Sequence, residues 1–401
     1  MVWLPSGTVN MMDVHQKVLQ RTLHDIAEEK GYDHGELKVL PVSTGGASYT
    51  SQLYCGKMSA PNKEDLKFFA KVATLGKDAR SMIPTSIYFT EQYVYRKLAG
   101  VYEKIEDKHQ VTSEHRFVFP VVYGYSDTDM EEVIVMQDLT AEGFTVQDRF
   151  SSFDWHYASA AVQQIARFHA LSIAMQHDFP ADYAELTEKI KFQKTLDQSM
   201  SGMFLQTVYK SVELVKEEYK ERLREYLKIY LPKAIATYHD TPPRPVLNHG
   251  DFRMSNIMHK KRQDDGIEVI LIDYQILHIA SAVKDLMHFI FTGSDAAFRR
   301  QYYHKLLEHY YQQLSHALTR LHLDPGIVLS KEDFDADMKE NSHLGLVFAL
   351  YTIPVVTVAE EQAPVPGEVL GLKNLMQTEA TQLCKDRLNE VVEDYITWGV
   401  I

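Results

Sequence analysis

The sequence predicts an α+β fold in two parts, a small antiparallel sheet followed by a larger helical part. In the first third of the chain, short strand-like runs alternate with Gly, Pro and Asn, which is typical of strands and turns. Past Asp138, apolar residues recur every three or four positions over long stretches, which indicates helices. One pair of strand-like runs, near residues 256–273, interrupts the helices. Two parts of such different character predict two lobes with a cleft between them.

The N-terminal part opens with a helix at residues 13–30, which Gly31 ends. Its apolar residues form one stripe, made of Val14, Val18, Leu19, Leu23 and Ile26. The strand-like runs that follow are 37–42, 49–55, 67–73, 117–123 and 132–136. A further helix is expected at about 83–99, between the third and the fourth of these runs.

The C-terminal part is predicted to be mainly helical. The expected helices are 154–175, 185–217, 219–238, 295–321 and 375–397. Residues Pro364–Gly367 contain two prolines and a glycine, and we expect a loop there.

Composition limits the class of protein. A chain of 401 residues with 45% hydrophobic and 24% charged residues is ordinary for a folded protein of about two units. The formal net charge of −13 argues against a nucleic-acid binder. Two cysteines, Cys55 and Cys384, exclude a disulfide framework and fit a reducing compartment. The start of the sequence lacks the pattern of a signal peptide, and no apolar run is long enough for a membrane span. We therefore expect a cytoplasmic protein. The sequence does not indicate its oligomeric state.

The most informative stretch is VLNHGDFRMSNIMHKKRQDDGIEVILIDYQ. An apolar run leads directly into His249–Asp251, and Asn256 comes five residues after the aspartate. Two apolar runs joined by a turn at Asp264–Gly266 predict a hairpin over residues 257–272. A hairpin returns the chain to its starting end, so Asn256 and Asp273 are expected to lie side by side.

Three oxygen-bearing side chains, those of Asp251, Asn256 and Asp273, are therefore expected in one small volume. Phosphoryl transfer needs such a set, with one carboxylate to orient the hydroxyl or accept its proton and two oxygen ligands for Mg²⁺. Asp and Asn near turns are often only turn formers or caps, which is our interpretation of Asp264 and Asp265. For the three residues at the hairpin mouth, the order and spacing favour function.

This pattern resembles the kinase fold of aminoglycoside and choline kinases, and more closely the ecdysteroid kinase-like family, also called CHK kinase-like. The resemblance covers most of residues 35–395. The residues that carry it are Phe168-His169-Ala170, His249-Gly250-Asp251, Asn256, Ile272-Asp273-Tyr274-Gln275, Asp285-Leu286 and the segment Met136–Leu139. It implies a two-lobed protein-kinase-like fold, with a nucleotide-binding N-lobe at 1–136, a hinge at 137–142 and a helical C-lobe at 143–401 that carries the catalytic loop and the acceptor site.

The resemblance also implies roles for single residues. Asp251 resembles the catalytic base, and Asn256 and Asp273 resemble the two Mg²⁺ ligands. Asp285 resembles a buried carboxylate that holds the backbone of the catalytic loop. His249 resembles a packing and hydrogen-bonding histidine rather than a proton carrier, since Asp251 already has that role.

Candidate nucleotide contacts lie in the N-terminal part. Gly45 and Gly46, between two strand-like runs, let backbone N–H groups approach phosphate oxygens, although a plain hairpin turn explains them equally well. Lys71 lies within an apolar run, where a lysine favours contact with an anion. By resemblance, Glu91 pairs with this lysine, the alternative being a glutamate that faces solvent.

Two more expectations rest on the resemblance. The backbone of Gln137–Leu139 is expected to meet the edge of the adenine. Arg253 stands where many relatives have tryptophan and where serine/threonine kinases have a lysine aimed at the transferring phosphate. A guanidinium suits phosphate well, and the alternative is a surface ion pair.

The sequence therefore predicts a phosphotransferase that uses ATP and Mg²⁺ to phosphorylate a hydroxyl of a small molecule. The resemblance implies an ecdysteroid or a related hydroxylated metabolite or toxin as the acceptor. Two alternatives stay open. A choline- or aminoglycoside-type kinase would share these motifs and take a cationic acceptor in an acidic, aromatic-walled pocket. A nucleotide-binding pseudokinase could instead act as a scaffold.

Overall fold

The computed structural model describes residues 14–42, 50–80, 86–190, 197–359, 362 and 379–401. These residues form two compact units. The first unit holds residues up to 80 and residues 120–145, and the second holds 86–119, 146–359 and 379–401. The first is built on an antiparallel sheet and the second is mainly helical, which confirms the predicted α+β class. The lobe boundaries proposed at 136 and 142 stay predictions, and the helix that begins at Ser86 groups with the helical unit.

The first unit is a five-stranded sheet of order β1-β2-β3-β5-β4 in which hydrogen-bonded neighbours are antiparallel. Its elements are α1 (Val14–Lys30), β1 (Glu36–Val42), β2 (Ser51–Ser59), β3 (Leu66–Ala73), α2 (Lys77–Arg80), β4 (Val122–Ser126), β5 (Val133–Gln137) and the 3-10 turn η3 (Leu139–Glu142). The strand predicted at 117–123 begins only at Val122. Phe117 and Phe119 instead pack with aromatic residues of the helical unit.

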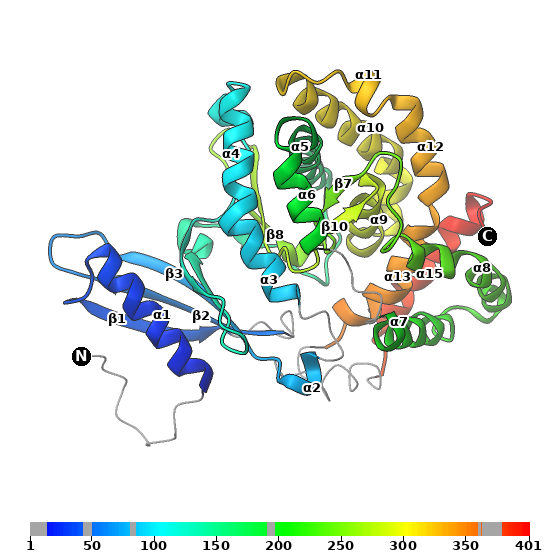
Figure 1. Ribbon diagram of the computed structural model, residues 1–401. Helices are drawn as coiled ribbons and strands as arrows, with labels where there is room; N and C mark the ends of the chain where they lie inside the picture. The colour runs from blue at the N-terminus through cyan, green and yellow to red at the C-terminus, as the bar shows by residue number, and fades with distance from the viewer. Residues whose placement is uncertain (1–13, 43–49, 81–85, 191–196, 360–361, 363–378) are drawn as a thin grey trace. The chain divides into compact units, whose positions relative to one another are not determined.

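Helix α1 packs on this sheet (Figure 1), and four residues of the predicted apolar stripe, Val18, Leu19, Leu23 and Ile26, lie in the core. Val18, Leu19 and Leu23 are buried in one core with residues of β2, β3 and β5. Ile26 lies against β4 at Gly124, where an added Cβ would come within 2.5 Å of its side chain. Glycine is therefore what allows the helix to approach the strand so closely.

The second unit begins with α3 (Ser86–Tyr93), which continues without a break through a π-helical segment, η1 (Val94–Leu98), into α4 (Ala99–Lys108). The helices that follow are α5 (Trp155–Asp178), α6 (Pro180–Lys189), α7 (Asp197–Val212), α8 (Glu217–Ala236), α9 (Ala282–Gly293), α10 (Ala296–Arg320), α11 (Pro325–Val328), α12 (Lys331–Asn341), α13 (His343–Val356) and α15 (Gln382–Thr397). Its short strands and turns are η2 (Ser113–His115), β6 (Thr145–Val146, which begins at the boundary), β7 (Val246–Asn248), η5 (Met254–Asn256), β8 (Ile257–Lys261), β9 (Ile267–Leu271) and β10 (His278–Ala280).

Helices α5 and α9 form the interior of this unit. All twelve residues of α9 are buried, and the helix packs against α13. Helix α5 packs along α10 and against β7 and β9. The sequence predicted α5 and α10 well but missed α9, a helix of only twelve residues whose polar members, Lys284, Asp285 and His288, are themselves buried. The expected loop at Pro364–Gly367 lies outside the described residues.

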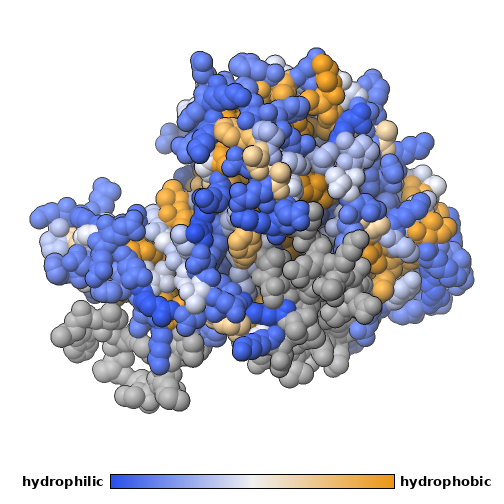
Figure 2. Space-filling model, in the orientation of Figure 1, coloured by the Kyte–Doolittle hydropathy of each residue, from blue (hydrophilic) through white to orange (hydrophobic). Residues whose placement is uncertain are grey.

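No helix within the described parts of the chain combines the length and the apolar character that a membrane span requires. Figure 2 shows a largely hydrophilic surface on the viewed face, with apolar side chains in small groups. The exposed large apolar residues come from several separate elements, among them Leu40, Tyr209, Ile229 and Ile327.

A buried carboxyl in α4 makes the stability of the helical unit depend on pH. Burial raises the pKa of Glu106 to about 7, although its Oε1 accepts a hydrogen bond from Phe117 N at 2.7 Å. Because this pKa is higher in the folded state, the stabilisation is present at low pH and is lost as pH rises from about 4.5 through 7.

We expect Glu106→Gln to raise the free energy of unfolding at about pH 8 by on the order of 2–3 kcal/mol, with little change at about pH 5. The amide keeps an oxygen for Phe117 and has no charge to bury. Urea unfolding at both pH values measures this difference, with the exposed Glu103→Gln on the same helix as the control. An equal effect of Glu106→Gln at both pH values would contradict the assignment.

Candidate active site

The hairpin β8–β9 forms where the sequence predicted it. Ile257 pairs with Leu271, and Ile272 N donates to Asn256 O at 3.0 Å. The turn at its far end closes with Arg262 N donating to Gly266 O at 2.7 Å. Asn256 and Asp273 therefore emerge side by side at the mouth of the hairpin, as expected.

The loop before the hairpin brings Asp251 to the same place. Asn256 Nδ2 donates to Asp251 Oδ2 at 2.7 Å and to the Asp251 carbonyl at 2.9 Å. Arg253 Nε donates to Asp251 Oδ1 at 2.8 Å. Because the Asn256 amide turns its nitrogen toward Asp251, its oxygen is directed elsewhere and can serve as a ligand.

Asp251 is ionised in this environment. Burial would raise its pKa, but Arg253, His288 and His249 outweigh that effect and lower it to about 2. The side chain nevertheless remains 22% exposed, so a small molecule can reach it. Such a carboxylate accepts hydrogen bonds well and takes up a proton only when the proton donor becomes strongly acidic.

A buried carboxylate on α9 holds the loop in place. Asp285 Oδ2 accepts from His249 N at 2.7 Å, and its Oδ1 accepts from Gly250 N at 3.0 Å. On its other side, His169 Nε2 on α5 donates to Oδ2 at 3.2 Å, and Tyr310 OH on α10 lies 2.7 Å from His169 Nδ1. Burial raises the pKa of Asp285, but His169, His249 and Gly250 hold it below its ordinary value. The structural role implied for Asp285 is confirmed.

His249 and Gly250 shape the turn between these two carboxylates. His249 Nε2 lies 2.9 Å from Ile272 O and therefore donates to it, which ties the loop to the hairpin. Gly250 has φ +84°, and a Cβ there would lie 2.2 Å from Ile276 O, so no other residue fits. The contacts of His249 agree with a packing and hydrogen-bonding role.

The chain at Asp273 is held in place by the aromatic packing of the next residue. The next residue, Tyr274, is fully buried between His249, Phe168 and Tyr95, with ring centroids 4.7–5.7 Å apart. Asp273 itself has φ +68°, a left-handed conformation that is unusual outside glycine and is often found at functional sites. The packing of Tyr274 therefore holds the backbone at Asp273 in this conformation, at some cost in strain.

Glu91 on α3 is 2% exposed, so the solvent-facing alternative is wrong. Glu91 lies on the same side of the helix as Tyr95, which follows it about one turn later. The pKa of Tyr95 is raised by burial first, and then by the charges of Glu91 and Asp273 among others. Glu91 therefore belongs to the buried surroundings of the Asp273 segment within this unit.

The donors present fit a divalent cation held partly by phosphate. The described residues contain no group of three or more His, Cys, Asp or Glu side chains that could hold a metal ion. An Asn256 amide oxygen and an Asp273 carboxylate are hard oxygen ligands of the kind that Mg²⁺ takes from a protein when nucleotide phosphates complete its shell.

The predicted nucleotide contacts of the first unit are placed as follows. Lys71 is half-buried in the middle of the sheet, paired in register with Leu53 and Ile134. Gln137 N donates to Val121 O at 2.8 Å, and Leu139 O accepts from Phe144 N at 3.0 Å. These two backbone atoms thus already have partners, and the adenine contact stays a prediction. Gly45 and Gly46 lie outside the described residues.

Two buried basic residues of α9 were missed, one of them close to Asp251. His288 on α9 places Nε2 3.9 Å from Asp251 Oδ1. Lys284, one turn earlier on the same helix, is 2% exposed, and its Nζ lies 3.0 Å from the ring centroid of Tyr238. Burial lowers the pKa of Lys284 well below its ordinary value. Their spacing from Asp285 was visible in the sequence, but it has meaning only once 282–293 is known to be a helix.

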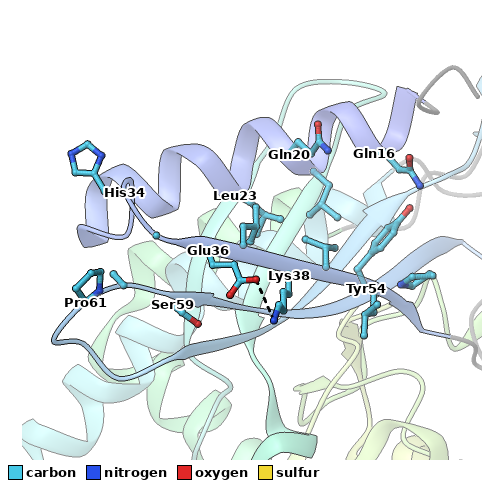
Figure 3. A pocket seen from close by; sticks show the side chains of 16 residues that line it. Gln16, Gln20, Leu23, His34, Glu36, Lys38, Tyr54, Ser59 and Pro61 are labelled. Atoms are coloured by element: carbon cyan, nitrogen blue, oxygen red, sulfur yellow. Dashed lines mark ion pairs between the residues drawn. The ribbon is translucent and has the colours of Figure 1, made fainter. Parts of the chain in front are cut away.

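A large groove in the first unit is a separate feature. It has a volume of about 1130 Å³ and lies between α1 and the strands β1 and β2 (Figure 3). Among its described lining residues, Glu36 and Lys38 pair with each other at 3.2 Å. None of the residues predicted to carry chemistry lines this groove.

The anchored loop, the hairpin and the three oxygen-bearing side chains are the parts of a small-molecule phosphotransferase of the kinase-like group. Residues 45–323, well over half of the chain, match the ecdysteroid kinase-like family. The chain belongs to that family and is a small-molecule kinase. No curated protein matched the chain.

Solved structures with a similar chain course include an ethanolamine kinase of Plasmodium vivax, at 12% identity over 98% of each chain and a TM-score of 0.49. A microcompartment-associated aminopropanol kinase matches at 12% identity over 94% of this chain and 98% of its own, with a TM-score of 0.47. The GDP complex of an aminoglycoside 2'-phosphotransferase matches at 10% identity over 92% and 99%, with a TM-score of 0.44.

Proposed function

We propose that the protein transfers the γ-phosphoryl group of ATP, with Mg²⁺, to a hydroxyl of an uncharged and largely apolar alcohol such as an ecdysteroid. The observation that carries this proposal is the hairpin mouth. There an ionised Asp251 lies beside Asn256, whose amide nitrogen donates to Asp251 and whose oxygen is directed away. Asp273 follows the paired strand β9 two residues after Leu271, which pairs with Ile257, the neighbour of Asn256.

Mg²⁺ and ATP, when bound, supply the phosphoryl group and neutralise the charge that develops on it. Asn256 and Asp273 would hold the metal. Asp251 orients the acceptor hydroxyl through a hydrogen bond. As the hydroxyl oxygen gains its bond to phosphorus and ADP leaves, the hydroxyl becomes acidic and its proton passes to Asp251. A pKa of about 2 suits this order of events, because the carboxylate stays ionised until the oxygen is already bonded.

The remaining nucleotide contacts are proposals of the same kind. Lys71 would contact the phosphates and Glu91 would fix its position, which the burial of Glu91 supports. Gly45 and Gly46 would supply backbone N–H groups, and the Gln137–Leu139 backbone would meet the adenine. A cytoplasmic location likewise stays a prediction.

The charges around Asp251 favour an uncharged acceptor over an amine. Arg253 lies at 2.8 Å from its Oδ1 and carries a permanent positive charge. A protonated amine beside the reacting hydroxyl would meet this charge, whereas a cationic acceptor needs a wall of acidic residues. Phe348 and Tyr351 on α13 add aromatic rings, which suit an apolar skeleton and a cation alike, so the charge of Arg253 is what favours the uncharged alcohol.

The test is turnover of ATP by the purified protein with Mg²⁺ and a panel of ecdysone, choline, ethanolamine and kanamycin. ADP release and the mass of the phosphorylated product are measured together. We expect phosphorylation of ecdysone and little of the amines. Turnover with an amine alone would favour the cationic-acceptor kinase. Nucleotide binding without turnover on any acceptor would favour the scaffold.

Arg253 is expected to act on the transferring phosphate. In the structure it pairs with Asp251 rather than with a surface acid, and Nε is the atom used. A guanidinium presents several N–H donors in a planar fork, a geometry that suits phosphate as well as carboxylate oxygens. Arg253→Ala should lower kcat and kcat/KM together by roughly 10- to 100-fold with ATP KM nearly unchanged. Arg262→Ala, which removes an exposed arginine from the hairpin turn, is the control. A loss confined to acceptor KM would place Arg253 in the acceptor site instead.

A further inference from the structure

His288 has a position that the roles given above do not explain. It lies on α9 three residues after Asp285, and both side chains point toward the loop that carries Asp251. The histidine is 6% exposed, and its ring stacks on Phe348 of α13 with centroids 4.9 Å apart and planes 24° apart. Two helices therefore hold the ring, and its Nε2 is directed to the catalytic carboxylate.

The distance between the two groups is the informative quantity. His288 Nε2 and Asp251 Oδ1 are 3.9 Å apart, which is too long for a hydrogen bond. A single oxygen atom can lie about 2.8 Å from each of them, since two such contacts span more than this separation. The other polar contact of Nε2, with Thr352 Oγ1 at 3.4 Å, is also long. One bridging hydroxyl would therefore satisfy both atoms at this separation.

We propose that His288 binds the acceptor hydroxyl together with Asp251. The hydroxyl donates its hydrogen to Asp251 Oδ1 and accepts a hydrogen bond from His288 Nε2. One lone pair of the oxygen is then fixed by the histidine, which leaves the other directed at the phosphorus. This inference rests on the proposed phosphotransfer to an alcohol and names the residue that orients that alcohol.

The electrostatics agree with this geometry. Burial lowers the pKa of His288, Asp251 raises it and Arg253 lowers it again, with the net direction downward. A neutral imidazole carries one N–H and can donate it without adding a positive charge beside the attacking oxygen. An uncharged donor of this kind lowers the nucleophilicity of the hydroxyl less than a cation does.

The role also bears on the acceptor itself. The carbon that carries the hydroxyl must lie near the edge of the ring that stacks on Phe348, where Tyr351 and Thr352 of α13 follow. Tyr351 in turn packs on Phe204 of α7 at 4.8 Å. An alcohol on an apolar skeleton suits this wall, because aromatic rings bury apolar area well.

Two variants separate the nitrogen of His288 from its packing. His288→Phe keeps a flat ring to stack on Phe348 but has no hydrogen-bonding atom. His288→Gln keeps an N–H group at about the reach of Nε2. His343→Phe is the matched control, since His343 is a buried histidine that packs against Tyr230 elsewhere in this unit.

We expect His288→Phe to lower kcat/KM for the alcohol by roughly 10- to 100-fold with ATP KM unchanged. His288→Gln should recover activity to within about fivefold, and the control should stay close to wild type. Binding of ecdysone, measured by calorimetry with a non-hydrolysable ATP analogue, should weaken in His288→Phe in parallel. This measurement does not require turnover.

Wild-type kinetics in His288→Phe would overturn the proposal while leaving the proposed function intact. Equal losses in the Phe and Gln variants would also overturn it, because they would show that shape rather than the nitrogen matters. If His288→Phe fails to fold, the Gln variant decides alone, since it must then retain both binding and turnover. A wild-type protein that phosphorylates no alcohol and binds none would instead defeat the proposed function.

Discussion

Changing Asp273 to alanine is expected to abolish Mg²⁺-dependent turnover of ATP while the protein remains folded. The carboxylate emerges from a paired strand beside Asn256, and the packing of Tyr274 holds the backbone there. Removing it takes away one of the two protein ligands proposed for the metal, and metal-bridged phosphates supply much of the stabilisation of the transition state. Alanine in the left-handed conformation of residue 273 costs only about 1–2 kcal/mol, which the fold should withstand.

Two comparisons make this result specific. Asp273→Asn tolerates the same backbone conformation and keeps one oxygen, so it should retain the fold and part of the activity. Asp264→Ala removes an exposed carboxylate from the far end of the same hairpin and should have no effect. Thermal unfolding and ATP turnover at several Mg²⁺ concentrations are measured for each. Wild-type turnover of Asp273→Ala at saturating Mg²⁺ would show that the metal assignment is wrong.

Replacing Asp251 by asparagine is expected to lower kcat by about 10²-fold or more with little change in ATP affinity. The amide is nearly the same size but cannot take the proton from the hydroxyl. It also presents an N–H group to either Arg253 or Asn256, both of which donate to the carboxylate now. The rate of the chemical step should therefore fall far more than the affinity for ATP.

Single-turnover kinetics and calorimetry with an ATP analogue separate these two effects. Tight nucleotide binding with a slow chemical step is the expected result. A large loss of ATP affinity with a nearly normal chemical step would instead assign Asp251 to the nucleotide contacts. Asp264→Asn in the hairpin turn provides the matched control for exchange of an aspartate.

The sequence predicted mainly those parts of the site whose residues lie close together along the chain. Asp251, Asn256 and Asp273 lie within one short segment whose turn and apolar runs specify a hairpin, so their meeting follows from strand register alone. Asp285 was assigned through its resemblance and its apolar neighbours, and its two hydrogen bonds to the loop confirm that role.

The parts that the sequence did not reveal depend on α9 and on short strands. Residues 282–293 were not recognised as a helix, so the alignment of Lys284 and His288 one turn apart was missed as well. The short strands β7 and β10 pair over three residues each, too few for a pattern. Arg253 was expected at a phosphate or a surface acid, and its partner in the structure is Asp251 itself. The direction of a side chain in a loop depends on how the whole protein packs, and the spacing of residues in the sequence does not reveal it.

The π-helical segment η1 makes the number of residues in this part of the chain important for the packing of the helix. It lies between Glu91, on α3, and the buried residues of α4, and it includes Tyr95. A π-helical turn holds one residue more than an α-helical turn in the same place. Removing one residue here would restore α-helical bonding and rotate Glu91 by about 100° relative to α4. The helix content would barely change, yet Glu91 would point in a different direction relative to the buried residues of α4. Insertions and deletions in this segment are therefore expected to disturb the packing as much as substitutions of buried residues do. A sequence alignment that is shifted by one position across the segment would match inward-facing residues with outward-facing ones.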